Sequence, residues 1–84
     1  MAKAKKKPEI DLTKPDAILK HIEAEIEMGV PDWQEYSWIQ IGALPPHSII
    51  YSIDDECPAD KHDKIEKTII EQTNLIGIPA EFHD

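Results

Sequence analysis

The sequence predicts a small α+β fold, a two-layer sandwich in which two helices cover one face of a mainly antiparallel three-stranded sheet. Apolar residues recur at helical spacing in two segments and alternate with polar residues in three others. These segments follow the order helix, strand, strand, helix, strand, which is typical of two-layer sandwiches. The chain has 84 residues, 40% of them apolar and fourteen of them isoleucine, enough for one modest core. We expect a basic tail and lead-in over residues 1–12 and a single domain over residues 13–84.

The first helix is predicted over residues 14–28. Its apolar side chains form one stripe, which consists of Ile18, Leu19, Ile22 and Ile26. Thr13 is the expected N-cap and forms a capping pair with Asp16. Pro15 stands in the first turn, where its missing N–H costs nothing. Gly29 follows as the residue at which the chain leaves the helix.

Two strands joined as an antiparallel hairpin are predicted over residues 36–43 and 48–54. Both segments are rich in β-branched and aromatic residues, and the connection between them is short. The residues expected on one face are Ile39, Ile41 and Ala43 in the first strand and Ile49, Tyr51 and Ile53 in the second. The connecting residues 44–47 contain two prolines, and either proline peptide bond can be cis.

The second helix is predicted over residues 60–74, where Asp60 and Asp63 resemble another capping pair. Its buried side carries Ile65 and Ile69. The third strand is predicted over residues 75–82. Its alternating apolar residues are Ile76, Ile78, Ala80 and Phe82. Because Pro79 cannot donate to a ladder, we place this strand at an edge of the sheet.

Charge is distributed very unevenly along the chain. The 17 acidic residues outnumber the nine lysines, there is no arginine, and the formal net charge is −8. Residues 1–7 carry four lysines and no acid, whereas residues 21–60 carry nine acids and no lysine. An acidic body repels nucleic-acid phosphates and anionic lipid heads and attracts basic surfaces. The alternative is that the acids serve solubility alone.

The sequence also disfavours several classes of protein. No apolar stretch approaches the roughly 20 residues needed to cross a bilayer, and the N-terminus lacks the apolar region of a secretory signal. Cys57 is the only cysteine, so an internal disulfide and a four-cysteine zinc site are excluded. We expect a reducing, cytoplasmic location with no membrane partner, and at most weak nucleic-acid contact through the tail from Lys3 to Lys7.

The candidate partner-binding residues combine three aromatic side chains with nearby acids. They are Trp33, Glu35, Tyr36, Trp38, Asp54, Asp55 and Glu56. In a strand, Tyr36 and Trp38 lie on the face opposite Ile39, so they project away from the helices if the isoleucines face them. Tryptophan and tyrosine are enriched at binding hot spots. The alternative is that the tryptophans are large core residues of a small domain.

The segment from Asp54 to Asp63 is the other candidate for chemistry, because it combines five carboxylates with Cys57 and His62. Its spacing matches no calcium loop, and carboxylates at a helix N-terminus also complement the helix dipole. The surrounding negative charge opposes formation of a thiolate. We therefore assign no catalytic residue, metal ligand or cofactor. His21 and Glu25, four positions apart, are expected to form a hydrogen-bonded pair.

These observations favour a small, acidic, non-enzymatic interaction module that binds a basic protein surface, in an inhibitor, immunity, antitoxin or nucleic-acid-mimic role. Two alternatives stay open. One is a small metal-dependent or cysteine-using enzyme centred on the segment from Asp54 to Asp63. The other is a homo-oligomer, in the simplest case a homodimer, built by pairing exposed strand edges.

Overall fold

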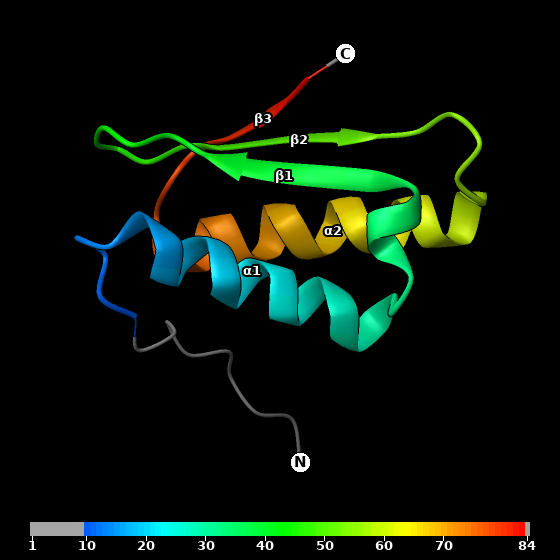
Figure 1. Ribbon diagram of the computed structural model, residues 1–84, viewed down its shortest axis with the longest axis horizontal. Coiled ribbons are helices and arrows are strands. Elements are labelled where there is room, and N and C mark those ends of the chain that lie inside the picture. Colours follow the sequence, from blue (N-terminus) through cyan, green and yellow to red (C-terminus); the bar gives the residue numbers. More distant parts are fainter. Residues whose placement is uncertain (1–9, 84) are drawn as a thin grey trace.

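The computed structural model describes residues 10–83, and it confirms the predicted fold class. Its elements are α1 (Pro15–Gly29), the short 3-10 helix η1 (Trp33–Glu35), β1 (Ser37–Ile41), β2 (Ile49–Ile53), α2 (Ala59–Ile76) and β3 (Ala80–Phe82). Both helices lie side by side under one face of the sheet, and the other face is bare (Figure 1). The predicted basic tail over residues 1–12 falls mostly outside the described residues. Of that segment, Ile10 and Leu12 pack against the core.

The sheet has the strand order β1–β2–β3. β1 and β2 are antiparallel, with Ser37 opposite Ile53, and β2 and β3 are parallel, with Ile49 beside Ala80. The parallel pair arises because α2 carries the chain back along the sheet before β3 begins. β3 lies at an edge, as predicted, and Pro79 just before it contributes a carbonyl oxygen to the N–H of Ile49 at 2.9 Å.

The core lies between the helices and the inner face of the sheet. It is built mainly from isoleucine: Ile18, Ile22 and Ile26 of α1, Ile65, Ile69 and Ile76 of α2, and Ile39, Ile49 and Ile53 of the strands. The three residues of α1 are the stripe read from the sequence, without the half-buried Leu19. The alternation of β1 and β2 follows the prediction within the two strands, because every second residue faces the helices. Two flanking residues differ: Ala43 lies beyond β1 and is exposed, and the half-buried Tyr36 packs against the core instead of projecting from the other face.

The predicted start and end of the first helix were wrong in detail. The N-cap of α1 is Lys14, with no side-chain capping bond, so Thr13 and Asp16 form no capping pair. The N–H and the hydroxyl of Thr13 instead both donate to Oδ1 of Asp11, at 3.0 and 2.5 Å. Gly29 is still helical, and Val30 forms the C-cap by donating its N–H to Ile26 at 2.8 Å.

The second helix is longer, and the third strand shorter, than predicted. α2 begins after Pro58, so Asp60 lies in its first turn and caps nothing. The helix continues to Ile76, which is a core residue of α2 and not the first inward residue of a strand. Gly77 ends the helix in the left-handed region with φ 90°, and the strand is left with three residues. The peptide bond between Pro45 and Pro46 is cis, one of the two predicted options.

The left-handed C-cap of α2 gives a direct test of this boundary. Gly77→Ala is expected to lower the free energy of unfolding by about 1–2 kcal/mol, because an L-residue with a side chain resists this backbone conformation. Nothing lies within 4 Å of the added Cβ, so the loss would come from the backbone alone. Gly29→Ala is the control: it is also open but helical, and is expected to be neutral or slightly stabilising. Urea denaturation measures the free energy of unfolding of both variants. Equal changes would contradict the assignment of Gly77 as the left-handed C-cap of α2.

Candidate functional site

One end of the molecule concentrates carboxylates. There, α1 leads through η1 into β1, and the turn after β2 leads into α2 (Figure 1). The carboxylates at this end, which we call the acidic end, belong to Glu27, Asp32, Glu35, Asp54, Asp55, Glu56 and Asp60. All of them except the half-buried Asp32 are exposed. Lys61 is the one lysine between positions 21 and 63, so little positive charge from the same segments offsets them.

Two contacts join the loops of the acidic end. The N–H of Asp54 donates to the carbonyl oxygen of Tyr36 at 2.6 Å, which continues the β1–β2 ladder beyond the strands. The ammonium of Lys61 lies 2.6 Å from Oδ2 of Asp32 and 5.3 Å from the centre of the Tyr36 ring. This hydrogen bond lowers the pKa of the Asp32 carboxyl and raises the pKa of the Lys61 ammonium. Lys61 thus offsets Asp32, and the acidic end keeps a net negative charge.

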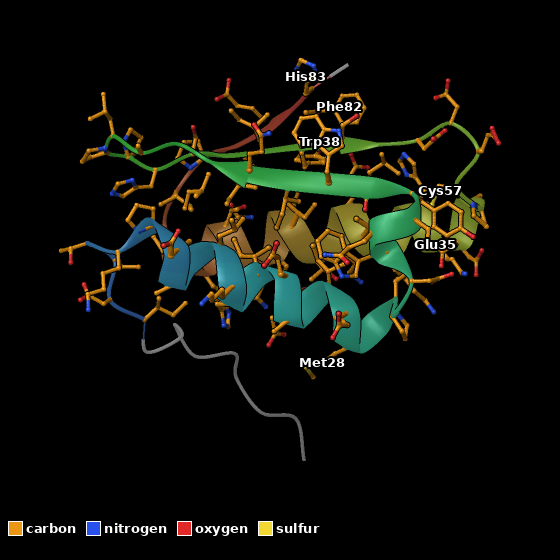
Figure 2. The ribbon with its side chains drawn as sticks, in the orientation of Figure 1. Met28, Glu35, Trp38, Cys57, Phe82 and His83 are labelled. Carbon is orange, nitrogen blue, oxygen red and sulfur yellow. The ribbon has the colours of Figure 1, made fainter. Side chains whose placement is uncertain are left out.

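A hollow of about 310 Å³ opens at the acidic end, where η1 meets the hairpin. Its lining is Gln34, Glu35, Tyr36, Ser37, Trp38, Ser52 and Asp54. Four of these are candidate partner-binding residues, which the hairpin register and η1 bring together. Figure 2 shows Glu35 at this end and Trp38 on the bare face of the sheet. Hydrogen-bonding groups and an aromatic ring beside carboxylates are suited to a cationic side chain with an apolar stem.

The two tryptophans of the candidate set have different positions. Trp38 is 39% exposed and packs against His83 of the C-terminal segment, with ring centroids 5.5 Å apart. Trp33 is only 3% exposed and belongs to the core, so it cannot contact a partner directly in this conformation. Its carbonyl oxygen accepts a hydrogen bond from the Ser37 hydroxyl at 2.7 Å, while its indole N–H is buried without a partner among the described residues. Trp33 positions the start of β1 beneath the acidic end.

The opposite end of the sheet is different in character. The loop of residues 42–48 between β1 and β2 contains no acid and no lysine, and Leu44 at its tip is 81% exposed. The buried His47 places Nδ1 2.8 Å from the carbonyl oxygen of Gly42 within this loop. Within residues 10–83, the acidic end holds seven acids and one lysine, whereas the remainder holds eight acids and four lysines, so negative charge is concentrated at the acidic end.

The C-terminal end of α1 adds to this polarity at a cost in stability. Cations are favoured near the last turn of a helix and anions are disfavoured there. α1 has no basic residue in its last turn, and Glu27 stands two residues before its end. Glu27 therefore increases the negative potential at the acidic end and does not stabilise α1.

This arrangement predicts an unusual gain in stability. Glu27→Gln is expected to raise the free energy of unfolding by about 0.3–1 kcal/mol, because it removes an anion from the negative end of the helix dipole. Asp16→Asn is the matched change at the other end of α1, where an acid is favourable, and it is expected to lower stability by a similar amount. Thermal and urea unfolding of the two variants at low salt would show the opposite signs. Two changes of the same sign would contradict the dipole argument.

The enzyme alternative depends on Cys57, which lies just before α2. Its side chain is buried, and Sγ lies 3.5 Å from the carbonyl oxygen of Pro58. Burial raises the pKa of the Cys57 thiol, and nearby carboxylates raise it further against the opposing effect of Lys61. His62 is within 3.9 Å of Asp63 and has no recorded contact with the thiol. Within the described residues, no three His, Cys, Asp or Glu side chains are arranged to share a metal ion.

Because Cys57 is buried and its pKa is raised, we expect it to be a slow nucleophile. We expect alkylation of the folded protein by iodoacetamide at about pH 8 to be at least about tenfold slower than alkylation of the urea-unfolded chain. The rate of the folded protein should also rise at higher pH than that of the unfolded chain, because burial favours the protonated thiol. Equal rates and equal pH midpoints would contradict this and would favour the cysteine-using enzyme.

Some residues of this region were missed or misjudged from the sequence. His21 bonds across to the second helix, with Nε2 2.7 Å from Oε1 of Gln72, and not to Glu25 as expected. Gln34, Ser37 and Ser52, which line the hollow, were not singled out as site residues, nor was Lys61, which lies over the Tyr36 ring. The signal for Lys61 was present, because a single lysine inside a long acidic stretch is a natural partner for one of its acids.

Comparison with known proteins gives no guide to the function. No protein-family model matches the chain, and no curated protein or solved structure is significantly similar to it. In the described part of the chain, neither helix has the length and apolar character needed to cross a membrane.

Proposed function

We propose that the protein is a non-enzymatic interaction module of the cytoplasm whose acidic end binds a basic surface of a partner protein. The observation that carries this proposal is a hollow lined by the exposed Glu35, Asp54 and Trp38, with the exposed Asp55 and Glu56 next to Asp54 in the chain. The carboxylates attract a cationic partner and orient it, and the half-exposed indole supplies apolar contact area. Because the loop of residues 42–48 at the other end is uncharged, a cationic partner is attracted to the acidic end and not to this loop.

The polarity of charge favours this proposal over a role in solubility alone. Solubility requires net charge but no particular distribution of it, so acids could be spread evenly at no cost to the helices. Here the acids extend to the last turn of α1, where they are unfavourable for the helix. A negative field concentrated at one end accelerates association with a cationic partner and makes it sensitive to salt.

The roles that suit such a module are those in which a basic groove is covered. An inhibitor, an immunity- or antitoxin-type partner and a nucleic-acid mimic all present carboxylates to a surface that otherwise binds phosphates or acidic substrates. These roles share one physical requirement, an acidic surface of fixed shape. The backbone bond between Asp54 and Tyr36 and the ion pair of Lys61 with Asp32 supply that rigidity.

The experiment is capture of partners from a lysate of the source cell at low salt, followed by elution with a salt gradient. Three baits are compared: the wild type, an acidic-end variant carrying Asp54→Asn, Asp55→Asn and Glu56→Gln, and a control carrying Asp11→Asn, Asp16→Asn and Glu81→Gln. Both variants lose three negative charges, but only the first loses them at the acidic end. The proposal predicts a basic protein captured by the wild type and the control and lost by the acidic-end variant. Capture that depends only on total charge would overturn it.

A further inference from the structure

The two edges of the sheet differ in how they are protected against a further strand. β3 has three residues, follows Pro79 and carries the charged Glu81, features that blunt an edge. β1 has five residues, Ser-Trp-Ile-Gln-Ile, with no charge, proline or glycine among them. An edge of this length and composition is a ready template for another strand.

The ladder register identifies which groups of β1 are free. Bonds from Asp54 to Tyr36 and from Gly42 to Ser48 show that even-numbered residues of the first strand pair with β2. In an antiparallel ladder the intervening residues point their N–H and carbonyl groups the other way. The backbone groups of Ser37, Ile39 and Ile41 therefore face the outer edge, and among the described residues no hydrogen bond to them is recorded.

The surroundings of this edge select a cationic occupant. A hollow of about 270 Å³ lies beside it, lined by Glu23, Trp33, Gln34, Ser37, Trp38 and Ile39. The half-exposed Trp38 offers an apolar wall, and Glu23 of α1 offers a carboxylate at the rim. A lysine or arginine side chain can place its aliphatic stem on the indole and its charge beside the acid. The acidic end lies beside the start of β1, where Glu35 and Asp54 are located.

From this geometry we propose that the free edge of β1 receives an extended, lysine- or arginine-bearing segment of the partner as a fourth strand. The inference rests on the proposed function and specifies how the partner is held. Main-chain hydrogen bonds to Ser37, Ile39 and Ile41 supply affinity, and the hollow with Glu23 selects a basic side chain at alternate positions. A second copy of this chain is a poorer occupant, because each copy carries a net charge of −8.

The test uses two capped heptapeptides of equal charge, one alternating lysine with valine and one alternating lysine with proline. The first can extend as a strand, and the second cannot. The readout is amide hydrogen exchange of β1 by NMR. We expect the lysine–valine peptide to slow exchange at Ile39 and Ile41 by about tenfold or more, with a smaller change at Trp38 and Gln40, which are already bonded to β2.

A pair of variants supports the exchange measurement. Ile41→Pro removes an outward N–H and is expected to weaken binding of the lysine–valine peptide by about tenfold. Ile41→Ala loses the same packing but keeps the N–H, and is expected to change affinity by less than about threefold. If the proline variant fails to fold, the exchange pattern of the wild type alone decides the question.

The outcomes separate this inference from the proposed function. If neither peptide binds, the proposed function fails together with the inference. If both bind equally and exchange at Ile39 and Ile41 is unchanged, only the inference fails. If the amides of Ile39 and Ile41 are protected without peptide, and the protection grows with protein concentration, the edge is occupied by a second copy and the inference is overturned. If that protection is lost on deletion of residues 2–7, the edge is occupied by the chain's own basic segment and the inference is also overturned.

Discussion

Neutralising the turn before α2 is expected to abolish most binding to cationic ligands while leaving the fold intact. With octalysine as the probe at low salt, a variant carrying Asp54→Asn, Asp55→Asn and Glu56→Gln should bind about 3–150-fold more weakly than the wild type. This range follows from three exposed ion pairs of about 0.2–1 kcal/mol each. The measurement is titration calorimetry of both proteins with the same peptide.

The choice of amides protects the local structure from side effects. Oδ1 of Asp54 accepts a hydrogen bond from the N–H of Glu56 at 2.9 Å, and an asparagine can accept the same bond. All three side chains are exposed, so unfolding in urea should change by less than about 0.5 kcal/mol. A weaker affinity with unchanged stability would assign the loss to the surface. An equal loss of affinity in the control carrying Asp11→Asn, Asp16→Asn and Glu81→Gln would contradict the account.

The largest effect on stability is expected from truncation of the isoleucine core. Ile69 of α2 is fully buried, whereas the next residue, Ile70, is 44% exposed. Ile69→Ala is expected to lower the free energy of unfolding by about 2–5 kcal/mol, because it removes buried methyl groups and leaves a cavity. Small domains have total stabilities of about 5–15 kcal/mol, so this variant should lie near the limit of folding.

Ile70→Ala is the matched control, with the same change of side chain one position along the same helix. It is expected to cost less than about 1 kcal/mol, since much of the side chain is already in water. Thermal unfolding followed by circular dichroism would measure both. Similar losses from the two substitutions would mean that α2 packs on the sheet through a different face.

Much of the fold could be predicted from the sequence because its periodic signals are local. The stripe of Ile18, Ile22 and Ile26 fixes the buried face of α1, and alternation fixes the inward residues of the hairpin. The end of α2 was missed because the isoleucines at positions 76 and 78 imitate the alternation of a strand. Gly77 followed by Pro79 is the stronger signal, because a glycine with a proline soon after it marks the end of a helix.

The candidate site was predicted in part for the same reason. A hairpin over residues 36–43 and 48–54 brings Tyr36 opposite Asp54, so local pairing alone joins the aromatic and acidic groups. The burial of Trp33 could not be predicted, because the turn at residues 32–36 has no periodicity to show which side faces the core. A lone lysine in an acidic stretch predicts an ion pair, but the choice of Asp32 as the partner of Lys61 depends on how α2 packs near η1, which no local pattern encodes.

The most direct test of the central claim is a map of where a polycation contacts the domain. Octalysine is titrated into isotopically labelled protein at about 20 mM and about 200 mM salt, and backbone and indole N–H shifts are followed by NMR. Shifts are expected to be confined to residues 32–41 and 54–61 and to Glu23, including the Trp38 indole, with strong attenuation at the higher salt. Shifts spread evenly over the surface, or centred on the uncharged loop of residues 42–48, would contradict it.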